Sequence, residues 1–398
     1  MFTLRRYRTL FRIPGLRAAF LSSVVGRLPI GIAGLAILLY VQGTSHSFAQ
    51  AGVASALYVL GLAAAAPLLG RLIDHAGAGP VLTACSALYP AALLMLIIAV
   101  ESGAHPLWIA AAALTAGAAL PPVSACMRAL FPQVVHDPTL LPTAYSLDSA
   151  LVEFIFIVGP ALVATCVAAG YPALAVGLAA LCAAAGGYIF VRAPVVRDWV
   201  PVRERGAARG RGPLRRPQLL LVFLITLCYS VAFGLFEIAV TAFAAQKHRP
   251  ATAGIALALA SVGSAAGALA YGSRHWGTPL PRQFLLALLG MAASILLMTP
   301  LDSIVAFVGV AVIAGVPMAT VIAIQSMLVS QLTPREMLAE SFTWGTTCLL
   351  GGISLGLAAG GLLAERIAPG GTMATAAGIT ALGAALTLVL KPEVGAPG

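Results

Sequence analysis

The sequence predicts an all-α polytopic membrane protein whose twelve transmembrane helices form two pseudo-symmetric six-helix bundles. Three observations lead to this prediction. The chain of 398 residues is 60% hydrophobic and only 9% charged, whereas soluble domains carry about 25% charged residues. Apolar runs long enough to be transmembrane helices recur along it. The second half of the chain also repeats features of the first half.

The apolar runs define twelve expected spans. The first run follows a basic N-terminal segment and is longer than a signal-peptide core, so we expect it to be retained as a transmembrane helix. The six cysteines stand singly within the runs, in no metal-binding spacing, which favours packing roles. The expected spans are 18–40, 48–71, 79–100, 105–129, 143–168, 172–193, 218–245, 251–273, 282–300, 303–330, 335–364 and 371–390.

Positive charge is distributed unevenly between the connecting segments. If the arginine-rich central segment is cytoplasmic, nineteen of the 23 Lys and Arg residues lie on that side and three on the other. This bias predicts cytoplasmic termini. It also explains the net charge of +10 without a nucleic-acid partner. Arginine greatly outnumbers lysine and alanine is abundant, as in GC-rich bacterial genomes, so we expect a multi-pass protein of the bacterial plasma membrane.

The central segment divides the chain into two related halves. We predict an N-terminal six-helix bundle at 1–193, a cytoplasmic linker at 194–217 and a C-terminal six-helix bundle at 218–398. Segment 51–70 aligns with 253–272 at an offset of 202, and glycines coincide at three positions. Parallel repeats of this kind occur in transporters that rock about a binding site near the bilayer midplane.

One short connection, "GRLIDHAG" at 70–77, places an acid between two apolar runs. It is similar to the loop signature of the major facilitator superfamily. The matching residues are Gly70, Leu72, Asp74 and Gly77. Basic residues of that signature are replaced here by His75, Ala78 and Gly79. The resemblance extends to the span count, the repeat and the central segment. It implies a secondary transporter in which Asp74 faces the start of span 11 while the protein is open outward.

The expected start of span 11 offers a partner for Asp74. Thr333, followed by Pro334 and Glu336, has the pattern of a helix-capping box. A helix that starts there presents the positive end of its dipole to the cytoplasmic side. The alternative for Asp74 is a solvated carboxylate at a helix end. The predicted inner gate consists of Gly70, Asp74, Gly77, Thr333, Arg335 and Glu336.

Charge within a span is costly and marks functional candidates, and five ionisable residues of the expected spans are such candidates. Arg27 and Glu153 lie about 14 and 15 Å into their spans, near the middle of a core roughly 30 Å thick. Glu153 is either a proton-coupling or substrate-binding acid, or the counterion of Arg27. Arg27 is also a candidate for binding an anionic substrate, and Glu237 for coupling or substrate binding. Arg128 and Asp148 are expected to form an inner ion pair.

Other polar, aromatic and small residues within the spans suggest a cavity and close packing. Gly159-Pro160 resembles part of the drug/proton-antiporter motif, and span 11 repeats glycine at every fourth position from 352 to 360. Close helix packing explains both features. The candidates for lining a central cavity, or for packing beside it, are Tyr40, Tyr229, Phe233 and Gln325.

The sequence contains no phosphate-binding loop, zinc-binding helix motif or nucleophile elbow. We therefore predict no enzymatic activity, cofactor or metal. We expect a monomeric, proton-coupled exporter that moves a small amphiphilic compound across the lipid bilayer by alternating access. Two alternatives stay open. One is a proton symporter or facilitator that takes up a polar or anionic metabolite, and the other is a non-transporting receptor or scaffold on the same fold.

Overall fold

The computed structural model describes residues 4–199, 212–249, 251–364 and 366–391, and within these ranges the chain is helical, without strands. Twelve helical segments are long and apolar enough to cross a membrane, which confirms the predicted fold class. The first half contains α1 (Leu4–Leu10), α2 (Leu16–Ser45), α3 (Phe48–Ala76), α4 (Ala78–Glu101), α5 (Pro106–Ala119), α6 (Val123–Val134), η1 (Pro138–Leu140), α7 (Leu141–Ala168), α8 (Pro172–Arg192) and α9 (Pro194–Arg197). The second half contains η2 (Pro213–Arg215), α10 (Pro217–Gln246), α11 (Ala251–Gly272), α12 (Leu280–Leu297), α13 (Ile304–Leu332), η3 (Arg335–Met337), α14 (Leu338–Ala364), α15 (Pro369–Leu386) and η4 (Thr387–Val389).

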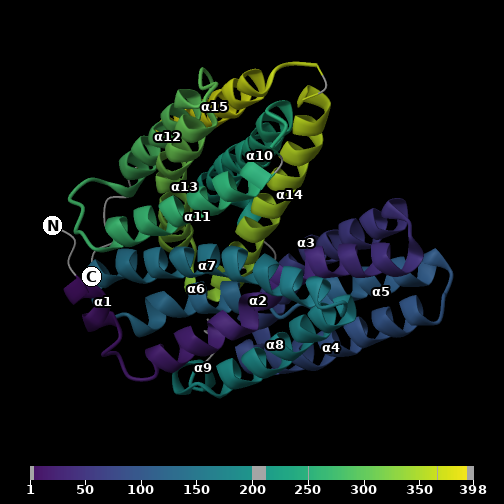
Figure 1. The fold of residues 1–398 in the computed structure, drawn as a ribbon. Helices are drawn as coiled ribbons and strands as arrows, with labels where there is room; N and C mark the ends of the chain where they lie inside the picture. Colours follow the sequence, from purple (N-terminus) through teal and green to yellow (C-terminus); the bar gives the residue numbers. More distant parts are fainter. Residues whose placement is uncertain (1–3, 200–211, 250, 365, 392–398) are drawn as a thin grey trace.

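The two halves repeat the same internal packing. In the first half α2 packs against α7 and α8, and α3 packs against α5. In the second half α10 packs against α14 and α15, and α11 packs against α13. With α2 equivalent to α10 and α3 to α11, these are the same contacts twice, as parallel repeats require. Figure 1 shows the purple and blue helices of the first half beneath the green and yellow helices of the second.

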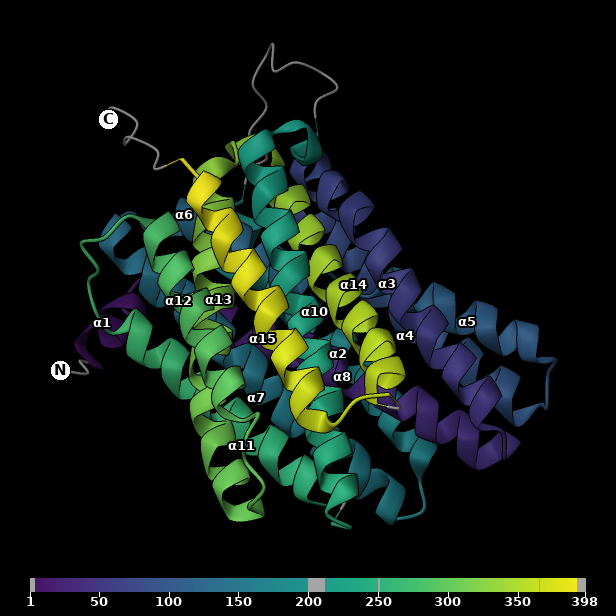
Figure 2. The same ribbon diagram turned by 90° about the horizontal axis from the view of Figure 1, so that it is seen from above.

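The halves meet at one end of the molecule and separate at the other. We call the end that carries α9 and η2 the linker end. One core cluster joins linker-end residues of the first half, such as Phe131 and Tyr145, to residues along the whole second half. A separate cluster, which includes Ile37, Tyr58 and Leu96, belongs to the first half alone. Figures 1 and 2 show α3 and α14 close together at one end and apart at the other.

Span 4 is divided into two helices. We expected one span over 105–129, but α5 ends at Ala119 and α6 begins at Val123. The intervening Pro121 and Pro122 lack a backbone N–H and cannot continue the helical hydrogen bonds. The short helix α6 extends to Val134 and packs against α2, α7 and α14. It therefore carries Arg128 to the boundary between the two halves.

Glycines let α10 and α14 approach closely, as the spacing in span 11 predicted. A Cβ atom added to Gly356 would lie 2.1 Å from the carbonyl oxygen of Val231, and one added to Gly234 would lie 2.3 Å from that of Ile353. No real side chain tolerates such distances, so the two backbones are in direct contact.

Replacing Gly356 by valine is expected to destabilise the second half, because overfilling a tight contact costs about 1–3 kcal/mol. Gly361→Val is the matched control, since a Cβ at Gly361 meets nothing within 4 Å. Thermal unfolding of the purified variants in detergent measures the difference. Equal melting temperatures for the two variants would show that the backbones are not in direct contact.

Candidate functional site

Asp74 connects the two halves at the linker end. It lies in the last turn of α3, and its carboxylate accepts hydrogen bonds from the backbone N–H groups of Ala339 (3.0 Å) and Glu340 (2.8 Å). These amides belong to the first turn of α14, which has no intrahelical partner for them. Asp74 therefore caps the positive end of a helix in the other half. The contact also offsets the unfavourable position of a carboxylate at the C-terminal end of α3.

Two glycines shape this contact. A Cβ atom added to Gly70 would lie 2.3 Å from Oγ1 of Thr343 and 2.8 Å from the carbonyl oxygen of Ala339. Only glycine leaves room for α14 at this position. Gly77 has a φ of 90° and ends α3, so that α4 begins at the next residue.

The predicted capping box at the start of span 11 is wrong. Thr333 ends α13, and its hydroxyl is buried without a hydrogen-bond partner among the described residues. Pro334 has a ψ of 151° and does not begin an α-helix. A 3₁₀ turn follows, and α14 begins at Leu338. Arg335 is exposed and Glu336 half-buried. The first turn of α14 is capped instead by the Asp74 carboxylate, in the role that we expected for the Thr333 hydroxyl.

An ion pair that the sequence reasoning missed lies beside Asp74. Nη2 of Arg71 donates to Oε1 of Glu340 at 2.8 Å, and Nε donates to Oε2 at 3.3 Å. The Glu340 side chain is 6% exposed and that of Arg71 is 55% exposed. Further along the same helices, Thr347 donates its hydroxyl to the carbonyl oxygen of Ala63 at 2.9 Å. Together with Asp74, these bonds hold α3 against α14.

The second contact between the halves joins α7 to α11. The hydroxyl of Thr143 donates to the carbonyl oxygen of Gly272 at 2.7 Å. Gly272 itself lies against Ser146, since an added Cβ would be 2.6 Å from the Ser146 Cβ. The bond and the close approach hold α7 against α11 at the linker end.

The N-terminal helix α1 spans the same boundary. The hydroxyl of Tyr7 donates to the carbonyl oxygen of Leu269 in α11 at 2.6 Å. Arg6 donates to the carbonyl oxygen of Thr139 in the first half. Burial raises the pKa of Tyr7, so its phenol stays protonated and remains a donor. A short segment outside the spans thus holds both halves together.

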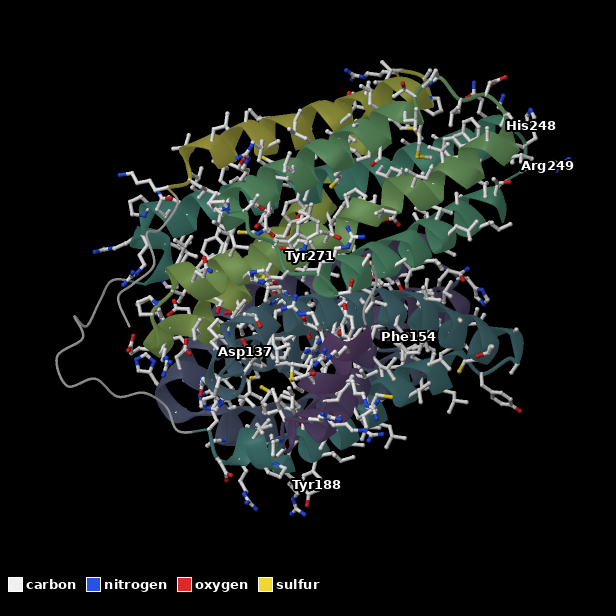
Figure 3. The ribbon with its side chains drawn as sticks, turned by 90° about the vertical axis from the view of Figure 1, so that its left-hand side faces the viewer. Asp137, Phe154, Tyr188, His248, Arg249 and Tyr271 are labelled. Carbon is white, nitrogen blue, oxygen red and sulfur yellow. The ribbon has the colours of Figure 1, made fainter. Side chains whose placement is uncertain are left out.

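A cavity of about 330 Å³ remains between the halves at the linker end. It is bounded by the start of α7, the α11–α12 connection and the end of α13, and its lining includes Tyr145, Tyr271, Trp276 and Gln331. Figure 3 places Tyr271 where the halves meet, with Asp137 on the linker side. His248 and Arg249 lie at the opposite end in the same view.

A buried charge cluster lies within the first half. Nη1 of Arg27 is 2.5 Å from Oδ1 of Asp148, and Nε of Arg128 is 2.7 Å from Oδ2. The Arg128–Asp148 pair thus has the expected partners, but Asp148 is shared with Arg27. The interpretation of Glu153 as the counterion of Arg27 is wrong. Asp148 on α7 takes that position, so Glu153 needs another explanation.

Glu153 contacts the second half instead. Oε1 of its carboxylate accepts a hydrogen bond from the hydroxyl of Ser264 on α11 at 2.8 Å. The Ser264 oxygen in turn accepts the backbone N–H of Ala319 on α13 at 2.9 Å. Because that N–H can only donate, the hydroxyl hydrogen of Ser264 is left to point at Glu153. One carboxylate is thereby linked to two helices of the other half.

The remaining candidate residues do not come together in one site. Glu237 is exposed on α10. Tyr40 does not line a cavity, because it is 2% exposed and donates to Glu101 on α4 at 2.7 Å. Tyr229 is likewise fully buried and Gln325 is 4% exposed, whereas Phe233 is half-buried and its ring packs edge-on against that of Tyr229. Within the described residues no group of three His, Cys, Asp or Glu side chains is arranged to hold a metal.

The two-bundle fold, the polar contacts between the halves at one end and the buried charges in the spans define a secondary transporter. Residues 19–357 match the model of the Major Facilitator Superfamily, and the chain belongs to this family. No curated protein matches the chain in sequence.

Two solved structures share the fold over nearly their whole length. One is a bacterial homologue of the iron transporter ferroportin in an outward-facing state, with a TM-score of 0.74 and 15% identity. The other is the human organic anion transporter MFSD10 (TETRAN), with a TM-score of 0.73 and 17% identity. Each alignment covers 94% of this chain and 98% of the other.

Asp74→Asn is expected to loosen the start of α14. Hydrogen bonds to a charged acceptor contribute about 1.5–3 kcal/mol, so amide protection at 338–343 should fall about tenfold or more. Hydrogen–deuterium exchange of the purified protein measures this change. Asp302→Asn is the control, because that carboxylate is 91% exposed and pairs with Lys247 away from the linker end. Unchanged protection in Asp74→Asn would contradict the cap.

Tyr7→Phe is expected to make the linker end open more often, because it removes one hydrogen bond between the halves. A bond worth about 1 kcal/mol corresponds to roughly fivefold more opening. The reporter is Ser146→Cys, at a site that is 0% exposed, with the six native cysteines replaced. Its rate of maleimide labelling should rise in Tyr7→Phe and stay constant in Tyr188→Phe, whose ring is half exposed. Equal labelling rates would contradict a clamping role.

Proposed function

We propose that this protein is a proton-coupled exporter of a small amphiphilic organic compound in the bacterial plasma membrane. Its termini and linker end lie in the cytoplasm, as the charge distribution predicts. With that orientation, the closed linker end and the separated opposite end correspond to an outward-facing state. Export completes a cycle when the contacts around Asp74 break and the opposite end closes.

The observation that carries the proposal is the environment of Glu153. In the described part of the chain its carboxylate has hydroxyl groups as partners, Ser264 at 2.8 Å and also Ser261, and no cation. A carboxylate that lies within a membrane span and has no cation beside it is suited to taking up a proton, because burial disfavours its charged form. Because Ser264 belongs to the other half, gain of a proton weakens a charge-assisted bond that holds α7 against α11. Proton binding therefore biases the movement of the halves.

The polar contacts at the linker end argue against a static scaffold. Asp74, Glu340 and Tyr7 all join the halves through hydrogen bonds at the boundary that alternating access must open. A protein that never moves gains more from an apolar interface of the same area. Uptake of an anionic metabolite is the second candidate, favoured by the surplus positive charge of the Arg27–Asp148–Arg128 cluster.

Transport in inverted vesicles with an imposed pH gradient tests the proposal over a panel of amphiphilic compounds. Export predicts that addition of a substrate alkalinises the vesicle interior. Glu153→Gln should abolish this proton movement while exchange of substrate down its own gradient continues. Glu237→Gln is the matched variant and should keep proton coupling.

Three results would contradict the proposal. Loss of coupling in Glu237→Gln alone would move the coupling role to Glu237. Accumulation only in right-side-out vesicles would indicate uptake. No movement in either kind of vesicle, with any compound of the panel, would favour the receptor or scaffold.

A further inference from the structure

We infer that the transported compound carries a negative charge and that Arg128 binds it at the boundary between the two halves. The inference rests on the proposed transport function and adds the charge class of the substrate and the residue that recognises it. The sequence alone pointed to Arg27 for such a role. The contacts of the two arginines assign it to Arg128.

The buried cluster has one positive charge more than it can neutralise. Asp148 uses one oxygen for Arg27, at 2.5 Å, and the other for Arg128, at 2.7 Å. One carboxylate thus serves two guanidinium groups. An uncompensated charge away from water is costly unless another group or a bound ion offsets it. A substrate anion is a partner of the required sign.

Neighbouring carboxylates on the linker side are already engaged. Asp74 is held by the first turn of α14 at 2.8 and 3.0 Å. Glu340 is paired with Arg71 at 2.8 Å. Among the described residues neither carboxylate forms an ion pair with Arg27 or Arg128, so two guanidinium groups share the one carboxylate of Asp148 in the closed state.

Arg128 is the most exposed member of the cluster. Its side chain is 11% exposed, whereas those of Arg27 and Asp148 are 1% and 0% exposed. It binds Asp148 through Nε alone, and its two terminal nitrogens have no hydrogen-bond partner among the described residues. These nitrogens form the planar fork that matches the oxygens of a carboxylate, sulfonate or phosphate. Arg27 cannot present its fork because it is buried.

A second potential donor lies near Arg128 in the other half. Tyr229 on α10 lies near enough to Arg128 to interact with its charge. Its hydroxyl is buried beside that of Thr226, three residues earlier on the same helix, without a well-formed hydrogen bond. A buried hydroxyl without a partner costs about 1–3 kcal/mol. An anion on Arg128 that also accepts from Tyr229 removes this cost and contacts both halves at once.

Glu237 favours the alternative that the substrate is a cation. It lies on the same helix as Tyr229, eight residues or about 12 Å further towards the opposite end. A cationic substrate held by Glu237 would leave Arg128 unused. The experiment must therefore compare anionic, neutral and cationic compounds of one shape.

Three naphthalene compounds with permanent charge states serve as probes: naphthalene-2-sulfonate, the neutral sulfonamide and the quaternary trimethylammonium analogue. Binding to the purified protein is measured from ligand-dependent melting temperature, and transport from exchange in proteoliposomes. The sulfonate should bind about tenfold or more tightly than either analogue, since a charge-assisted forked contact is worth at least that factor.

Variants then locate the site. Arg128→Gln should weaken sulfonate binding about tenfold or more, while Arg27 still pairs with Asp148 and keeps that carboxylate satisfied. Tyr229→Phe loses one hydrogen bond to the bound anion, so we expect at least a several-fold loss of sulfonate affinity. This variant keeps the test decisive if Arg128→Gln does not fold. Arg249→Gln, an exposed arginine at the opposite end, is the control and should bind as the wild type does.

The outcomes separate this inference from the proposed function. Binding or exchange of the sulfonamide or the ammonium compound as well as the sulfonate overturns the anion site, even if proton-coupled transport is intact. Sulfonate binding that both Arg128→Gln and Tyr229→Phe leave unchanged also overturns it. Selective sulfonate exchange that depends on Arg128 but moves no protons supports the anion site. The same result contradicts the proposed proton coupling.

Discussion

The closed end of this transporter depends on one carboxylate, Asp74, bound to the backbone of a helix in the other half. The Asp74 carboxylate and the start of α14 attract each other, because the first turn of α14 presents unpaired backbone amides and a partial positive charge. Gly70 makes the approach possible, since any side chain there would collide with Thr343. The arrangement explains why a chain with only 9% charged residues keeps an acid in this short connection.

The buried charges divide into a group that stays within one half and a group that crosses the boundary. Arg27 and Asp148 are sealed inside the first half and can move with it as one body. Glu153 reaches across to Ser264, and Asp74 reaches across to Glu340. Alternating access breaks contacts of the second kind and leaves the first intact. The residues whose contacts change between the two states are therefore those that face the boundary.

Much of this arrangement could be predicted from the sequence, because hydropathy and repeat spacing determine the spans and their pairing. The signature at 70–77 also identified Asp74 and the helix it faces. Partner choice was harder to predict. Arg27 lies at the depth of Glu153 in its span, yet it pairs with Asp148, because helix rotation and tilt decide which side chains meet. Thr333 had the right local pattern for a cap, but a carboxylate distant in sequence took that place.

The internal repeat puts a glycine in each of two equivalent helix contacts between the halves, α3–α14 and α7–α11, and these two contacts differ in chemistry. Gly70 and Gly272 are equivalent at the offset of 202. At Gly70 the adjoining bond is charge-assisted, through Asp74, whereas at Gly272 it is a neutral bond from Thr143. The position equivalent to Asp74 is Trp276, which has no carboxylate. The α3–α14 side therefore holds the halves through bonds to a carboxylate at the closed end, whereas the α7–α11 side combines a neutral bond there with the contact of Glu153 and Ser264 further along α7.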